Sequence, residues 1–268
     1  NLSSMPKIIL LAGTSPGSPI HVILLKTLKN MKVKPEIKAL TFDVFGTVVD
    51  WRSSIIDEGN QLNSEWGWEL NWEDFADRWR GMYQPSMEEV RSGKREWVIL
   101  DTLHRESLLT LLDEYGCKGV SEERVEHLNR MWHRLRPWSD SVEGLERLKK
   151  RFILATLSNG NVALLVNMAK FSSLPWDTVL GAEVSRSFKP MPHTYLTTAS
   201  MLGLAPEECM MVAAHNSDLQ VASGLGFRTA FVCRPKEYGP SQRTDLEAED
   251  DYDLIADDFI NLAEQLNC

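Results

Sequence analysis

The sequence predicts an α/β fold, with a doubly wound parallel sheet and an all-helical insertion after the first strand. Three observations lead to this prediction. After residue 137, short apolar segments alternate with helical ones, which is typical of a parallel sheet. An earlier apolar run, Ala39-Leu40-Thr41-Phe42, suits a buried strand and ends at Asp43. Between the two, residues 51–136 keep a helical spacing of apolar residues and show no strand pattern.

The core elements are placed by residue type and spacing. The first strand is expected over residues 38–43, and Gly46-Thr47 turns the chain away from it. Further strands are expected at Phe152–Leu157, Thr178–Leu180, Met210–Ala214 and Thr229–Cys233. Helices are expected at Val142–Lys150, Val162–Phe171, Pro192–Leu202, Ser217–Leu225 and Asp257–Leu266. The acidic run Glu247–Asp253 is interpreted as a solvated loop.

The inserted segment is amphipathic along its length. Phe75, Trp79 and Met82 follow one another at spacings of four and three residues, which places them on one face of a helix. This helix is expected to start near Asn71, where acidic residues occupy the first turn. Residues 51–136 are therefore expected to pack as a helical body of their own.

Composition narrows the classes of partner. The formal net charge is −9, which leaves no basic excess to bind nucleic acid. No apolar run has the length of a membrane span. The four cysteines are scattered without metal-ligand spacing, and we interpret them as reduced thiols of a cytoplasmic protein. Residues 1–36 are expected to be an appendage, a tag or a leader; they are acid-poor and lysine-rich, so mitochondrial targeting is the alternative.

Polar residues follow four of the expected strands. Because the carboxyl ends of parallel strands meet at one edge of a sheet, these side chains are expected to share a crevice. A carboxylate at such an edge, Asp43, is the candidate nucleophile. The four groups are Asp43 with Thr47, Ser158 with Asn159, Lys189, and His215 with Asp218.

These stretches carry a family resemblance. The segments DVFGTVVD from Asp43, LSNG from Leu157, the Lys189-Pro190 pair and the stretch around Asp218 resemble, in order, the four motifs of the haloacid dehalogenase superfamily. The resemblance covers residues 38–265. It implies a Rossmann-like core over residues 37–50 and 137–268, and it implies that residues 51–136 are a helical cap domain.

Two departures from the phosphatase pattern favour one branch of this superfamily. Its phosphatases carry D-x-D, whose second acid protonates the leaving oxygen, and here that position is Phe45. Their last motif supplies an acid for Mg²⁺ where this chain has Ala214. A halide leaving group needs neither a proton nor a metal. The sequence thus resembles the L-2-haloacid dehalogenases of type II, and neither a metal nor another cofactor is expected.

The resemblance implies a role for each candidate residue. Asp43 would displace halide from a short (S)-2-haloalkanoic acid, and water would hydrolyse the resulting ester to a 2-hydroxy acid. Arg80, with Arg78 as its rival, and Asn159 would bind the halide, and Phe45 and Tyr195 are placed with the substrate-binding residues. Ser158 and Lys189 would hold the carboxylate of the substrate or of Asp43. Thr47 would bond near Asp43, and Asp218 or His215 would activate water.

Other functions stay open at this stage. A hydrolase of small carboxylated epoxides, similar to the cis-epoxysuccinate hydrolases, is the first alternative, and a Mg²⁺-dependent phosphatase is the second. A non-catalytic binding protein on the same fold is the third. In each case the expected partner is a small anion rather than nucleic acid or a membrane, and a homodimer is possible.

Overall fold

The computed structural model describes residues 35–268, and residues 36–268 form one compact unit. The appendage predicted over residues 1–36 lies almost wholly outside the described residues. In the described part of the chain, no helix is both long enough and apolar enough to cross a bilayer.

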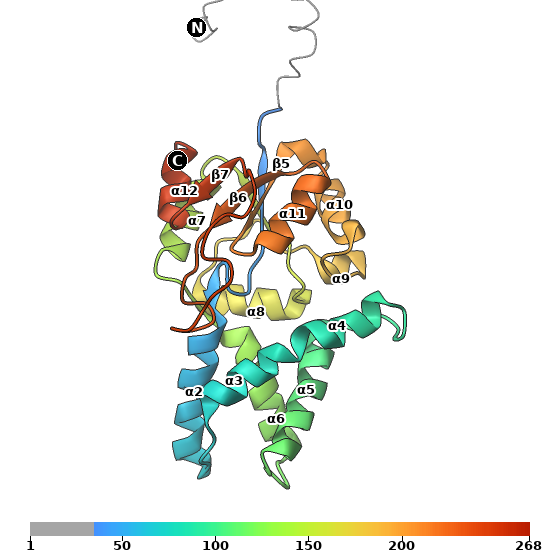
Figure 1. The fold of residues 1–268 in the computed structure, drawn as a ribbon, viewed down its shortest axis with the longest axis vertical. Coiled ribbons are helices and arrows are strands. Elements are labelled where there is room, and N and C mark those ends of the chain that lie inside the picture. The colour runs from blue at the N-terminus through green and yellow to red at the C-terminus, as the bar shows by residue number, and fades with distance from the viewer. Residues whose placement is uncertain (1–34) are drawn as a thin grey trace, which may run out of the picture. The chain divides into compact units, whose positions relative to one another are not determined.

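A parallel sheet forms the centre of this unit (Figure 1). In residues 35–268 it has five strands in the order β4-β1-β5-β6-β7, and each neighbouring pair is parallel. The strands are β1 (Ala39–Phe42), β4 (Ile153–Thr156), β5 (Cys209–Ala213), β6 (Arg228–Val232) and β7 (Leu254–Ala256). The chain runs from β1 to β4 on one side and from β5 to β6 on the other. The strand order therefore reverses between β1 and β5, which is where such sheets form binding crevices. The predicted α/β class is confirmed.

Each face of the sheet buries its own set of side chains, since successive residues of a strand point to opposite faces. Met210 and Val212 belong to one apolar cluster with Phe259, whereas Met211 and Ala213 belong to another. Helices α7 (Ser141–Lys149) and α12 (Phe259–Gln265) lie on one side of the sheet, and α10 (Pro192–Met201) and α11 (Asn216–Gly224) on the other (Figure 1). The remaining short elements of this part are α8 (Val162–Ser172), α9 (Ala182–Ser185) and η2 (Pro206–Glu208).

The helical insertion forms a layer beyond the carboxyl edge of the sheet (Figure 1). It begins and ends at a short antiparallel ribbon of β2 (Val49–Asp50) and β3 (Arg136–Pro137). Its elements are α2 (Trp51–Trp66), α3 (Trp72–Gly81), α4 (Tyr83–Arg91), α5 (Leu100–Glu114), α6 (Glu122–Asn129) and η1 (Arg130–Arg134). Asp50 caps α2 and Asn71 caps α3 through their side chains. The division into a core domain and a cap domain remains a prediction.

Two strand predictions differ from the structure. Thr178–Leu180 is not a strand, and Thr178 makes only an isolated bridge with Ala155. At Leu180 the Thr156 hydroxyl replaces backbone pairing, because it donates to the Leu180 carbonyl at 2.7 Å and accepts from the Leu180 amide at 3.0 Å. Strand β7 was not predicted, since it has three residues and follows an acidic segment.

A buried ion pair ties the segment after β6 to the start of α7. Arg234 donates to both oxygens of Asp140 at 2.8 Å, and Asp140 also accepts from the Phe259 amide.

We expect Asp140→Ala to lower the free energy of unfolding by about 3–5 kcal/mol, because it leaves a buried guanidinium without its partner. Urea titration followed by circular dichroism measures this. The control is Glu126→Ala, which removes an exposed pair with Arg130 and should cost about 0.5 kcal/mol or less; equal losses would contradict the prediction.

Candidate active site

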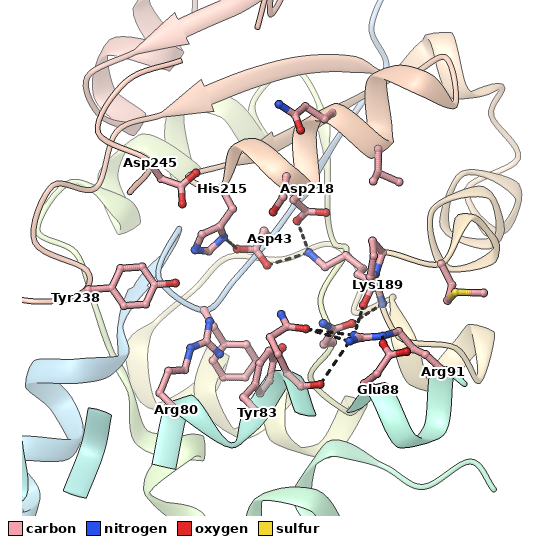
Figure 2. Close-up of a pocket in the computed structure, with 18 residues that line it drawn as sticks. Asp43, Arg80, Tyr83, Glu88, Arg91, Lys189, His215, Asp218, Tyr238 and Asp245 are labelled. Atoms are coloured by element: carbon pink, nitrogen blue, oxygen red, sulfur yellow. Dashed lines mark hydrogen bonds and ion pairs between the residues drawn. The ribbon is translucent and has the colours of Figure 1, made fainter. Parts of the chain in front are cut away.

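A cavity of about 870 Å³ lies between the carboxyl edge of the sheet and the helical layer. Asp43 follows β1 directly and is 6% exposed. Figure 2 shows Asp43, Lys189, His215 and Asp218 on the sheet side and Arg80 with Tyr83 on the side of the helical layer. The structure therefore brings together residues that the sequence placed at the ends of separate strands.

Lys189 joins the two aspartates. Its ammonium lies 2.9 Å from Asp43 Oδ1 and also bonds Asp218 Oδ2. The Lys189 backbone is held from both sides, because its amide donates to Asn159 Oδ1 at 2.7 Å and its carbonyl accepts from Arg91 Nη1 at 2.9 Å. Burial would lower the pKa of Lys189, but the Asp218 and Asp43 carboxylates outweigh burial and raise it. The lysine is thus a permanent cation.

The other oxygen of Asp43 receives two contacts. Thr47 Oγ1 donates to Asp43 Oδ2 at 2.7 Å, and His215 Nδ1 lies 3.1 Å from the same atom. The Thr47 hydroxyl is oriented by the Ala214 amide, which donates to it at 2.9 Å. Burial would raise the pKa of Asp43, yet Lys189 and His215 hold this pKa well below its usual range. Asp43 is therefore ionised, as a nucleophile must be.

His215 lies between two carboxylates. Its Nε2 is 2.9 Å from Oε2 of Glu237, a residue that is 1% exposed. Burial would lower the pKa of His215, but Glu237 and Asp43 outweigh it and raise this pKa well above 6.5. The sequence-based suggestion that His215 acts as a base assumed a pKa near neutrality. The raised pKa instead favours the imidazolium form of the ring, which has no lone pair to accept a proton.

Asp218 has both carboxylate oxygens engaged. One bonds Lys189, and the other accepts from the hydroxyl of Tyr195. Burial raises the pKa of Asp218, the Lys189 charge opposes this, and the neighbouring Asp43 charge adds to the rise. Burial and the Asp218 charge also raise the pKa of Tyr195, so the phenol keeps its proton and acts as a donor. The two aspartates thus differ, because the pKa of Asp43 is lowered whereas that of Asp218 is raised.

Arg80 faces the cavity from α3. Its guanidinium lies 4.3 Å from the ring centroid of Tyr83 and 5.4 Å from that of Trp51. Within the described residues, its buried Nη1 has no hydrogen-bond partner. Tyr83 and Asn159 also line the cavity. Arg78, the rival candidate, pairs instead with Glu114 on the surface, so Arg80 is the arginine at the site.

Three predicted residues do not line the cavity. Ser158 is fully buried, and its hydroxyl accepts from the Gly160 amide at 3.2 Å. Thr47 and Tyr195 reach the site only through Asp43 and Asp218. Phe45 does line it, and its ring packs against those of Tyr83 and Trp132. Direct contact of Ser158 or Tyr195 with a substrate stays a prediction.

Sequence reasoning missed several residues of the site, above all Glu237. This residue follows β6, so it also lies beyond the carboxyl end of a parallel strand, and the rule that found Asp43 would have reached it. Tyr83 lies three residues after Arg80, a spacing that fits one side of the helical layer. Arg91, at the end of α4, had no signal, because its contact with the Lys189 segment is to a backbone carbonyl. Tyr238 and Asp245 also line the cavity.

Among residues 35–268, no group of three or more His, Cys, Asp or Glu side chains is arranged to hold a metal ion. The position between the two aspartates, where a cation would balance their charge, is taken by the ammonium of Lys189.

Comparison with known proteins places this geometry in a family. The haloacid dehalogenase-like hydrolases match residues 37–226, and the chain belongs to this family of hydrolases. The resemblance seen in the four motifs is confirmed.

Individual proteins similar to this chain belong to the same family. The (S)-2-haloacid dehalogenase 4A of Burkholderia cepacia is 28% identical over 75% of this chain and 87% of its own length. The crystal structure of the L-2-haloacid dehalogenase PA0810 is 47% identical with a TM-score of 0.84, and the match covers 86% of this chain and 99% of that one. The crystal structure of the defluorinating L-2-haloacid dehalogenase Rha0230 is 46% identical with a TM-score of 0.85, over 87% and 96% of the two chains.

The pKa values of buried His104 and partly buried His215 are shifted in opposite directions. Burial lowers the pKa of His104 to about 3, so its ring stays neutral at pH 5, whereas the pKa of His215 is raised well above 6.5 and its ring should carry a charge at pH 7. Nitrogen-15 NMR of histidine-labelled protein separates the two forms, and His215→Asn and His104→Asn assign the signals. Because the native pKa of His215 is raised, its contribution to the free energy of folding is complete below about pH 6.5. That contribution is lost as the pH rises through the native pKa. A neutral His215 ring at pH 7 would contradict this prediction.

Proposed function

We propose that this protein displaces halide from short (S)-2-haloalkanoic acids and forms 2-hydroxy acids through an ester on Asp43. One observation carries the proposal. A buried and ionised carboxylate, Asp43, faces the guanidinium of Arg80 across the cavity, and that guanidinium has a buried nitrogen without a protein partner among the described residues. A nucleophile opposite a charged group with an N–H donor to spare is the arrangement that a displacement with an anionic leaving group requires.

The reaction balances without a cofactor. A carboxylate oxygen of Asp43 forms a bond to C2 of the substrate as the carbon–halogen bond breaks, and the electron pair of that bond leaves with the halide. Direct displacement inverts the configuration at C2. Water then adds to the carboxyl carbon of Asp43, and the 2-hydroxy acid leaves with one proton released to solvent. The net change is haloacid and water to hydroxy acid, halide and a proton.

The departing halide has donors to receive it. A weakly hydrated guanidinium suits a large, diffuse anion, and Arg80 is further held against Tyr83 by a cation–π contact. The amide of Asn159 lies at the same end of the cavity. Phe45, which lines the cavity beside Asp43, has no proton to give, and a halide leaving group needs none.

The nucleophile is tested by substitution of Asp43 and by isotope labelling. With (S)-2-chloropropionate the wild-type protein should release chloride, and Asp43→Asn should fall below about a thousandth of that rate. In heavy-oxygen water, a single turnover should give lactate whose new oxygen comes from Asp43 and carries no label. Full labelling of the product in that turnover would rule out the ester, and equal activity on the (R) enantiomer would contradict the proposed stereochemistry.

The halide site is tested by a matched pair of arginine variants. We expect Arg80→Met to lower kcat/KM by about 100-fold or more, because it removes a charged donor that acts on the departing halide. Arg78→Met alters a surface ion pair two residues away and should stay within about two-fold of wild type. Chloride release at several substrate concentrations measures both. Equal losses in the two variants would show that Arg80 acts through the packing of the helix alone.

Carbon–fluorine bonds are a second candidate target. Fluoride is the halide that accepts hydrogen bonds most strongly, and Arg80, Tyr83 and Asn159 supply a charged donor and two neutral ones at one end of the cavity. The similarity to the defluorinating enzyme Rha0230 supports this extension. Fluoride release from fluoroacetate, measured with an ion-selective electrode, decides it, with Asp43→Asn as the control.

The same assays separate the alternative reactions. Hydrolysis of cis-epoxysuccinate without halide release from any haloacid would favour the epoxide hydrolase. Mg²⁺-dependent release of phosphate from an aryl phosphate would favour the phosphatase. In each case the partner is a small anion, and we retain the cytoplasmic location and a possible homodimer as parts of this proposal.

A further inference from the structure

Glu237 is a fully buried carboxylate that the reaction proposed above does not use. Three features hold it in place. Trp51 Nε1 donates to Glu237 Oε1 at 3.1 Å, and His215 Nε2 lies within 3.1 Å of both of its oxygens. The backbone of Gly46 lies against it, so that a Cβ at position 46 would come within 2.0 Å of Glu237. The absence of a side chain at Gly46, three residues after Asp43, thus leaves the space that this carboxylate occupies.

The two carboxylates on either side of His215 favour a proton on each of its ring nitrogens. Nδ1 faces Asp43 and Nε2 faces Glu237. A neutral imidazole has a single N–H and would turn a lone pair toward one of the carboxylates, whereas an imidazolium donates to both. Other titratable groups nearby are Tyr238, in the segment that holds Glu237, and Arg80 from α3, whose charge acts on Asp43 and Glu237. Lys189, which bonds Asp43, and Asp245 line the same cavity. His215 is therefore a donor toward Asp43 rather than an acceptor.

The two oxygens of Asp43 then have different tasks. Oδ2 receives bonds from Thr47 and His215, whereas Oδ1 receives, among residues 35–268, the Lys189 ammonium alone. The oxygen with fewer donors keeps a lone pair free, so Oδ1 is the atom that attacks carbon. Oδ2 becomes the carbonyl oxygen of the ester. When water adds to the carboxyl carbon, negative charge collects on Oδ2, where two donors already point.

We propose that Glu237 is a positioning residue that holds His215 as a charged donor, so that His215 and Thr47 form an oxyanion hole for hydrolysis of the Asp43 ester. The proposal rests on the proposed function and assigns a task in its second step. Ester formation removes the charge of Asp43, and Glu237 is then the remaining carboxylate that keeps the proton on His215. Donors aimed at the atom where charge develops, in a site without bulk water, lower the barrier of such a step.

The test measures the two chemical steps of the reaction, ester formation and ester hydrolysis, separately in the Glu237→Gln variant. With enzyme in excess over (S)-2-chloropropionate, quenched samples are followed by chloride release and by intact protein mass, which reports the ester on Asp43. Ester formation in Glu237→Gln should stay within about three-fold of wild type, whereas ester hydrolysis should slow by about 100-fold, so that the ester accumulates. As a control, Glu58→Gln removes a partly buried carboxylate outside the site, the ion-pair partner of Arg134, and should change neither step.

The pH dependence distinguishes a donor from a base. Without the charge of Glu237, the pKa of His215 in the ester should fall toward its ordinary value of about 6.5. If His215 is a donor, ester hydrolysis in Glu237→Gln recovers as the pH is lowered from 8 to 5.5, because the ring regains its proton. If His215 is a base, the rate rises with pH instead, and that result would overturn the proposal.

A second pair of variants covers a failure of Glu237→Gln to fold. His215→Asn keeps an N–H toward Oδ2 and should hydrolyse the ester at least ten-fold faster than His215→Ala. Equal rates in these two variants would sink the proposal, as would a Glu237→Gln variant that slows ester formation as much as ester hydrolysis. A wild-type protein that releases no halide from any haloacid would remove the proposed function itself, which is a separate outcome.

Discussion

The site depends on one buried ammonium group. Lys189 lies between Asp43 and Asp218 and bonds both. Two carboxylates this close would repel each other and one would take up a proton, so the lysine is what allows Asp43 to stay ionised. The same alternation of carboxylate and cation extends to His215, which lies between Asp43 and Glu237. Anions and cations alternate through the site, and each buried charge has opposite charges beside it, which offsets the cost of removing it from water.

The parallel sheet makes this series possible. Asp43 follows β1, His215 follows β5 and Glu237 follows β6, and these three strands are neighbours. Each strand therefore contributes one charged group at the same edge, at spacings set by the strand ladder. Lys189 comes from the long connection between β4 and β5 and is positioned by its backbone through Asn159. The helical layer adds Arg80 and Tyr83, which close the cavity from the opposite side (Figure 2).

The sequence was informative where a function is tied to the end of a strand. Asp43, Lys189, His215 and Asp218 were found because polar groups follow several apolar runs in succession, which is more than the ordinary composition of loops produces. The sequence was not informative where contacts between distant parts of the chain decide which side chain faces the cavity. Arg78 and Arg80 both flank the buried Trp79, so helical spacing could not choose between them.

Sequence reasoning also could not predict where a side-chain hydrogen bond takes the place of backbone pairing between strands. The residues at 178–180 have strand-like types, but a threonine hydroxyl from β4 takes the place of the ladder there. Likewise, nothing in the composition around Glu237 indicated that its charge is buried. Its partners lie 22 and 186 residues away along the chain.

The bond from Arg91 to the Lys189 carbonyl has a mechanical consequence. Arg91 ends α4, in the layer that closes the cavity, whereas Lys189 belongs to the part that holds the nucleophile. Any movement of α4 away from the sheet must therefore either break this bond or pull on the peptide of Lys189. The Arg91 guanidinium thus ties the position of α4 to the backbone that presents the ammonium to Asp43.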